Sequence, residues 1–307
     1  TSDYLLDFLK EKKIKKVFLL TGGAIAFVVD SFSKRKDIGY ICVQHEQAAA
    51  MMADAYSRVG PNFAATMSTS GPGATNLITG IACSYFDSIP NIHITGQVNT
   101  HEQIGAMLGT KKSRQIGFQE TNIVSITQPI TKKSLQLRKA EDIQNILEYL
   151  YNLSQDGRQG PVLLDIPMDM QRVEIKRKSL KVINKTYSKK KVLESKNTNK
   201  IIQLLERSLR PVIISGGGIR YSKSVKVFNK LVTKLKVPIV TTWSGIDTID
   251  YNNKYYIGHI GVYGSRSGNF TIQNSDLILS LGSRLDTRIT STRPSTFGRK
   301  AKLIIVD

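Results

Sequence analysis

The chain has 307 residues, 40% of them hydrophobic, so its length predicts two globular domains, each with its own core. Only two cysteines are present, Cys42 and Cys83, which excludes a disulfide framework and favours a reducing, cytoplasmic setting. The formal net charge of +20 raises nucleic acid as a partner, whereas the absence of a long apolar run excludes a membrane-spanning helix.

Short apolar runs alternate with helical stretches over the first half of the chain. Strands are predicted at 17–20, 38–43, 63–68, 91–95 and 161–167. Helices are predicted at 22–32, from Glu46 onward, at 73–86 and at 140–153. Strands that alternate with helices are typical of a parallel sheet covered on both faces.

A lysine-rich stretch follows, with nine Lys or Arg residues between Arg172 and Lys191. No zinc-ligand spacing or RNA-binding signature accompanies this charge, so we interpret it as a solvated linker and expect no nucleic-acid partner. The expected domains are 1–172 and 193–307, with the linker at 173–192.

A second α/β unit is predicted after the linker. Its helices are expected at 201–209 and 225–235, and its strands at 211–215, 238–243, 275–283 and 302–307. The predicted fold class is therefore α/β, with two three-layer domains built on parallel sheets, the second of them Rossmann-like.

Two glycine-rich segments join a strand to a helix. In STSGPGATN (68–76), glycines let the backbone approach a ligand, and the following helix N-terminus favours a polar or anionic group. A tight turn without a ligand explains this loop equally well. The segment SGGGI (215–219) resembles a dinucleotide-binding turn but lacks the full GxGxxG spacing.

Nine segments together resemble the thiamine-diphosphate-dependent enzymes, most closely the acetolactate synthase large subunits. The segments follow in that family's order: HEQAAAMMADAYSRVG (45–60), SGPGATN (70–76), YFDSIP (85–90), ITGQV (94–98), GFQETNI (117–123), GRQGPVLLDIPMDMQ (157–171), GGG (216–218), IGVYG (260–264) and NSDLILSLGSRLDTR (274–288). The resemblance implies a pyrimidine-binding N-terminal domain and a Rossmann-like central domain.

The resemblance implies that Glu46 is catalytic. In this family the matching carboxyl group hydrogen-bonds a ring nitrogen of the cofactor's aminopyrimidine and so promotes proton removal from C2 of the thiazolium. Small apolar neighbours such as Ala49 and Ala50 favour a carboxyl group that shares a proton. The alternative is an acid that stabilises the helix dipole. Without the other motifs, that alternative would be favoured.

Further residues are assigned by position in the matching motifs. The resemblance implies that Pro72 and Asn76 contact the pyrimidine end of thiamine diphosphate, and that Phe118 and Gln119 line the substrate pocket. Core packing is the alternative for Phe118. In acetolactate synthases the central domain binds FAD, while other relatives hold a different nucleotide or none. The matching positions here are Arg158, Gly216, Gly217, Gly218, Thr242, Gly264, Arg284, Asp286 and Arg288.

Several features depart from the acetolactate synthase pattern. Tyr263 stands where the family usually has a histidine, and Leu20-Thr21-Gly22-Gly23 replaces the usual tyrosine-proline-glycine-glycine turn. The long basic stretch 99–116 resembles related carboligases that add an acetyl unit to a keto sugar. Pyruvate is the expected donor, and the acceptor stays open. A NAD-dependent Rossmann oxidoreductase and a noncatalytic binding module are the other hypotheses.

The family's diphosphate and Mg²⁺ site uses a Gly-Asp-Gly motif that does not occur in this sequence. We therefore expect no metal ligand in this chain, with Mg²⁺ bound by a further C-terminal domain, and no turnover by the 307 residues alone. Because active sites in this family lie between two subunits, the resemblance implies a homodimer or tetramer.

Overall fold

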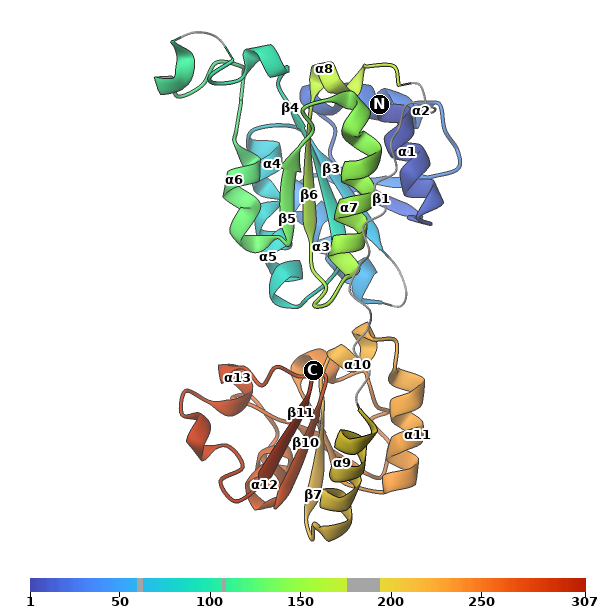
Figure 1. Cartoon of the computed structure of the whole chain (residues 1–307), viewed down its shortest axis with the longest axis vertical. Coiled ribbons are helices and arrows are strands. Elements are labelled where there is room, and N and C mark those ends of the chain that lie inside the picture. The colour runs from blue at the N-terminus through green and yellow to red at the C-terminus, as the bar shows by residue number, and fades with distance from the viewer. Residues whose placement is uncertain (60–62, 107–108, 176–193) are drawn as a thin grey trace. The chain divides into compact units, whose positions relative to one another are not determined.

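A computed structural model describes residues 1–59, 63–106, 109–175 and 194–307 of the chain. The chain divides into two compact units, Thr1–Lys190 and Lys191–Asp307, and each is described by itself (Figure 1). The predicted linker, 173–192, lies outside the described residues from position 176 onward. No helix among the described residues is both long and apolar enough to cross a bilayer.

The first unit is built on a six-stranded, all-parallel sheet with the strand order β2-β1-β3-β4-β6-β5. Its strands are β1 (Lys16–Leu19), β2 (Gly39–Cys42), β3 (Ala64–Ser68), β4 (Asn91–Gln97), β5 (Lys133–Gln136) and β6 (Val162–Pro167). Every residue of β3, β4 and β6 is buried, as expected for strands that are covered on both faces.

Helices cover both faces of this sheet. One face carries α1 (Ser2–Glu11), α2 (Ala26–Ser33) and α7 (Ile143–Gln155), and the other carries α3 (Glu46–Arg58), α5 (Ile78–Phe86) and α6 (Ile123–Thr127). The packing of α3 on α5 is close because a Cβ at Gly80 would lie only 2.3 Å from the Cβ of Ala50. Small residues in the Glu46 helix therefore allow this contact.

The predicted elements of the first unit are present, but the structure adds elements that were not predicted, among them α6 and the short helix α8 (Met168–Gln171). The helix predicted at 73–86 is divided into α4 (Pro72–Asn76) and α5, which meet at Leu77. Helix α1 was not predicted, although Leu5, Phe8 and Leu9 are fully buried. Strand β5 was not predicted either, because only Ser134 of its four residues is buried.

The second unit has a five-stranded, all-parallel sheet with the order β11-β10-β7-β8-β9. Its strands are β7 (Pro211–Ser215), β8 (Ile239–Thr241), β9 (Tyr256–His259), β10 (Leu277–Leu281) and β11 (Lys302–Val306). Helices α9 (Ser195–Arg207), α10 (Gly218–Tyr221) and α11 (Val225–Leu235) cover one face, and α12 (Arg266–Asn274) and α13 (Thr287–Thr290) cover the other.

Two parallel sheets with helices on both faces confirm the predicted fold class. Helix α9 begins six residues before the prediction, and β9 and α12 were not predicted. In parallel α/β folds, ligands bind beyond the carboxyl ends of the strands. In the first unit, the glycine-rich segment 68–76 follows β3 and is called the Gly71 loop below. The segment after β4 contains a turn at residues 117–121.

Candidate functional site

Glu46 begins helix α3, and only 6% of its surface is exposed. Asn76 Nδ2 donates a hydrogen bond of 2.9 Å to Glu46 Oε2, which holds one carboxylate oxygen in place. His45 precedes the helix as its N-cap, and its Nδ1 accepts the Gln47 backbone N–H at 3.1 Å. The histidine therefore shapes the start of the helix.

The loop after β3 approaches Glu46 because it contains glycines. A Cβ at Gly73 would lie 3.1 Å from Glu46 Oε1 and 2.6 Å from Thr69 Cγ2. Gly71 has φ 61° and ψ −128°, a backbone conformation that is unfavourable for any residue with a Cβ atom. Pro72 is exposed in the first turn of α4, and Asn76 ends that helix half-buried.

The turn at residues 117–121 lies against the same loop. Gln119 has φ 59°, and a Cβ at Gly71 would lie 2.6 Å from Gln119 Cβ and 2.9 Å from its carbonyl oxygen. Phe118 is 83% exposed, so the alternative of core packing for this residue is wrong. The structure thus brings Glu46, Asn76 and Gln119 around one glycine loop, with exposed Phe118 next to Gln119 in sequence.

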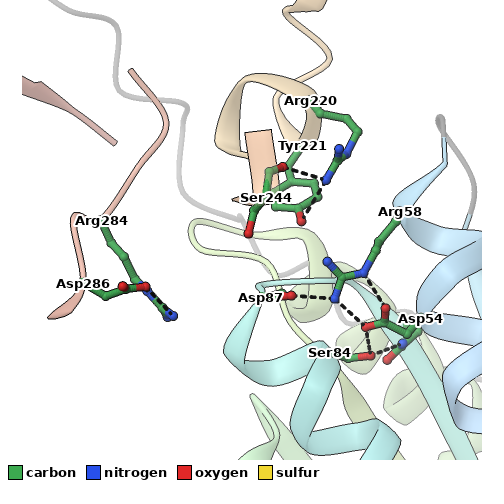
Figure 2. Close-up of polar contacts among 10 residues, drawn as sticks. Asp54, Arg58, Ser84, Asp87, Arg220, Tyr221, Ser244, Arg284 and Asp286 are labelled. Atoms are coloured by element: carbon green, nitrogen blue, oxygen red, sulfur yellow. Dashed lines mark hydrogen bonds and ion pairs between the residues drawn. The ribbon is translucent and has the colours of Figure 1, made fainter. Parts of the chain in front are cut away.

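A buried polar network behind α3 was missed in the sequence. Arg58 donates to Asp54 Oδ1 at 2.5 Å from Nε and to Asp87 Oδ2 at 2.6 Å from Nη2, and Ser84 Oγ donates to Asp54 Oδ2 at 2.8 Å (Figure 2). Asn91 Nδ2 donates to Ser84 Oγ at 2.8 Å. The network ties the helix that begins at Glu46 to α5 and β4. The i, i+4 spacing of aspartate and arginine was the one signal available in the sequence.

His93 extends this network and is completely buried. Its Nε2 lies 2.9 Å from Asn91 Oδ1, and its Nδ1 lies 2.8 Å from Thr66 Oγ1. Because the Asn91 amide nitrogen donates to Ser84, its oxygen must accept, so His93 carries its proton on Nε2 and Thr66 donates to Nδ1. Burial lowers the pKa of His93 to about 3, which keeps the ring neutral.

In the second unit, the three consecutive glycines pack against another turn of the same unit. A Cβ at Gly216 would lie 2.1 Å from the Gly282 carbonyl oxygen, and one at Gly218 would lie 2.7 Å from Gly282 Cα. The N–H groups of Gly216 and Gly218 donate to the carbonyls of Leu281 and Gly282. A Cβ at Gly217 would lie 2.9 Å from the Ser244 carbonyl oxygen. Close backbone contacts with the turns after β10 and β8 therefore favour glycine at all three positions.

The other residues of the second unit that were predicted to hold a nucleotide occupy the loops after β8, β9 and β10. Thr242 is buried, and a Cβ at Gly264 would lie 2.7 Å from the backbone of Ile260. Arg284 Nη2 lies 3.3 Å from Asp286 Oδ2, and Asp286 also caps α13 by accepting the backbone N–H of Arg288 at 2.9 Å (Figure 2).

Three further features bear on cofactor binding. Arg158 is exposed in the first unit, where its Nη1 lies 3.4 Å from Ser88 Oγ. In the second unit, exposed Trp243 and Tyr263 stack with ring centroids 5.4 Å apart. Within the described ranges, no three His, Cys, Asp or Glu side chains gather as a metal site requires.

Comparisons with known proteins match this architecture. The family described as "Thiamine pyrophosphate enzyme, N-terminal TPP binding domain" matches residues 1–126, and its central domain matches residues 198–307. The chain is 34% identical to an acetolactate synthase large subunit of Lactococcus lactis, with 100% of this chain and 52% of the relative aligned.

Two other relatives are similar to this chain at comparable identity and coverage. An acetolactate synthase large subunit of Cyanidium caldarium is 36% identical over 99% of this chain and 51% of its own length. The isozyme 2 large subunit of Escherichia coli is 31% identical over 100% of this chain and 53% of its own length. The chain spans about half the length of the curated relatives it matches. It belongs to the thiamine pyrophosphate enzymes, as a member similar to the acetolactate synthase large subunits, and carries their N-terminal and central domains.

Proposed function

We propose that the protein containing this chain is a thiamine-diphosphate-dependent carboligase that takes a two-carbon unit from pyruvate and forms acetolactate. The observation that supports this most directly is the Glu46 carboxylate, buried at the start of α3 with one oxygen held by Asn76. An acid that only stabilised a helix dipole would not need a second loop to enclose it.

The side chains around Glu46 fit the pyrimidine end of thiamine diphosphate. A heterocycle with ring nitrogens needs a carboxyl group that can share a proton, and Glu46 Oε1 faces Gly73, where no Cβ stands in the way. Pro72 and Asn76 belong to the same helix and would contact this end of the cofactor. When bound, thiamine diphosphate supplies a carbon nucleophile and an electron sink for the loss of CO₂ from a 2-keto acid.

The residues of this chain have separate parts in that chemistry. Glu46 holds the proton that it shares with the pyrimidine ring, and Asn76 keeps the carboxylate oriented through the 2.9 Å bond to Oε2. Phe118, on the exposed turn, offers an apolar surface to the keto acid, and Gln119 beside it offers amide hydrogen-bonding groups. The turn thereby serves the substrate, while α3 and α4 serve the cofactor.

The test is Glu46→Gln in the full-length natural protein that carries this chain. Hydrogen–deuterium exchange at C2 of bound thiamine diphosphate and acetolactate formation from pyruvate should both fall by about 10²-fold or more. Glu141→Gln is the matched control, because it makes the same chemical change at an exposed carboxylate of the same unit. Unchanged C2 exchange in the Glu46 variant would refute the assigned role.

Magnesium, FAD and the oligomeric state are finer parts of this proposal. We propose that Mg²⁺ is held with the diphosphate by a part of the protein outside this chain. Arg284 and Arg288 are exposed and suit a nucleotide pyrophosphate. The glycine turn at 216–218 already makes close contacts with the backbone of Gly282 and Ser244. Visible absorbance of the purified protein tests for the flavin, and sedimentation tests for the proposed homodimer or tetramer. The free cysteines Cys42 and Cys83 support a cytoplasmic location.

A keto sugar acceptor is the second candidate, and the segment between β4 and the 117–121 turn favours it. Glu120 closes this segment by accepting the backbone N–H groups of Ile104 at 2.6 Å and Ile116 at 3.1 Å. Its described part presents exposed Lys111 and Arg114, which suit a phosphorylated acceptor. Product analysis with pyruvate alone, and then with pyruvate plus a nucleotide-linked keto sugar, separates the two acceptors.

A further inference from the structure

Asp165 is a completely buried carboxylate that the proposed reaction does not use. It stands on β6, and its neighbours across the sheet are Thr95 on β4 and Gln136 on β5. Thr95 Oγ1 donates to Oδ1 at 2.7 Å, while Gln136 Nε2 and Gln97 Nε2 donate to Oδ2 at 2.9 and 3.2 Å. The buried carboxylate of Asp165 therefore accepts hydrogen bonds from three side chains, on β4 and β5.

Gln97 connects Asp165 to the 117–121 turn. Besides its bond to Asp165, Gln97 Nε2 donates to the Thr121 carbonyl oxygen at 2.7 Å, and Gln97 Oε1 accepts the Val98 backbone N–H at 3.1 Å. The carboxylate accepts only, so it requires the amide nitrogen on its side and leaves the amide oxygen for Val98. Asp165 and the Thr121 carbonyl oxygen therefore accept from the same amide nitrogen, so Asp165 anchors the side chain that bonds Thr121.

Both ends of the turn depend on this end of β4. Thr121 is held by Gln97, and Gly117 lies against Val98, whose Cγ2 would be 2.7 Å from a Cβ at Gly117. Between them, Gln119 packs on Gly71. A continuous set of contacts thus leads from the buried carboxylate to the turn that carries Phe118 and Gln119.

We propose that Asp165 is a positioning residue, which acts through the Gln97 amide to hold the 117–121 turn over the Gly71 loop and so sets the substrate side of the site. The expected effect on pyruvate turnover rests on the proposed function, whereas the expected effect on the order of the turn does not. Glu46 and Asn76 are outside this network, so the two sides of the site have different supports.

Three variants of the full-length natural protein test the proposal. Asp165→Leu removes the acceptor and leaves the second amide hydrogen of Gln97 without a partner, so that the Gln97 side chain loses its anchor on β6. Thr95→Val is the matched control, because it removes another donor to the same carboxylate with no link to the turn. The double change Asp165→Leu with Gln97→Met removes both members of this buried pair and leaves the Thr121 carbonyl oxygen without its side-chain donor.

The first readout is backbone hydrogen exchange, which needs no turnover. Exchange at Val98 and across residues 117–121 should rise about tenfold in Asp165→Leu, since the Gln97 amide that bonds Val98 and Thr121 loses its anchor. The double variant should regain thermal stability yet keep the fast exchange at 119–121. Thr95→Val should leave exchange in the turn unchanged. Unchanged exchange in Asp165→Leu, or an equal rise in Thr95→Val, would overturn the proposal.

The second readout separates positioning from a general structural defect. We expect kcat/KM for pyruvate to fall about tenfold in Asp165→Leu, whereas C2 exchange of bound thiamine diphosphate, which depends on Glu46, stays within about twofold of wild type. An equal loss of both would assign Asp165 a structural role only. If wild-type protein forms no carboligation product, the proposed function fails, and the exchange measurement still decides whether Asp165 holds the turn.

Discussion

Two buried titratable groups in the first unit should make opposite contributions to its stability in acid. Burial lowers the pKa of His93 to about 3, from 6.5 in an exposed ring. The unfolded chain therefore binds a proton that the folded chain does not. The stability that neutral His93 contributes is complete above pH 6.5 and is lost as the pH falls from there toward 3.

Asp165 works in the other direction. Burial raises the pKa of this carboxyl group to about 6, from 3.8, although the bonds from Gln136, Thr95 and Gln97 oppose the shift. Between these two values the folded state holds a proton that the unfolded state has released. Its contribution to stability therefore grows as the pH falls from 6 to 3.8 and is lost as the pH rises through 6.

The two contributions nearly cancel between pH 7 and pH 5. With these pKa values, acidification over that range costs about 2 kcal/mol at His93 and returns about 1.4 kcal/mol at Asp165. A variant that lacks one titrating group should show the pH dependence of stability that the other group causes. His93→Gln retains an acceptor for Thr66 and a donor for Asn91 without titrating, and Asp165→Asn removes the titrating carboxyl group.

The assay is urea unfolding of the whole chain at pH 7 and pH 5, followed by far-ultraviolet circular dichroism. Trp243 is the only tryptophan and lies in the second unit, so its fluorescence serves as an internal reference. Relative to wild type, His93→Gln should gain about 2 kcal/mol between pH 7 and pH 5, and Asp165→Asn should lose about 1.4 kcal/mol. Shifts of the same sign in both variants would refute the reasoning.

Three other substitutions test the glycine loops and a helix connection. In the full-length natural protein, Gly73→Ala should weaken thiamine diphosphate binding in calorimetry because its Cβ would lie 2.6 Å from Thr69 Cγ2 and 3.1 Å from Glu46 Oε1, whereas Gly23→Ala, with nothing within 4 Å, should bind normally. Gly216→Ala should destabilise the second unit by about 2 kcal/mol or more in the Trp243 fluorescence transition, since its Cβ meets a backbone carbonyl. Asp276→Asn should lower the same midpoint at pH 7 but not at pH 2, because bonds from Ser208 and two backbone N–H groups hold the pKa of this carboxyl group at about 2.

The sequence alone determined the fold class and the family. Runs of apolar residues separated by amphipathic stretches report local periodicity, which does not depend on knowing the partner of each strand. For this reason β3, β4, β6 and β10 were predicted correctly. Half-exposed β5 and β9 lack that signal, and contacts made after folding define them.

Tertiary structure alone decided which polar residues meet. Asp165 and Gln97 stand 68 positions apart, and Arg58 and Asp87 stand 29 apart, so only strand register and helix packing bring them together. The glycines at 216–218 suggested a ligand-binding turn in the sequence, and only the fold shows that Gly282 lies against Gly216 and Gly218 and that Ser244 lies against Gly217. Local patterns identify the side chains available for chemistry, whereas burial and the choice of hydrogen-bond partner depend on contacts between distant segments.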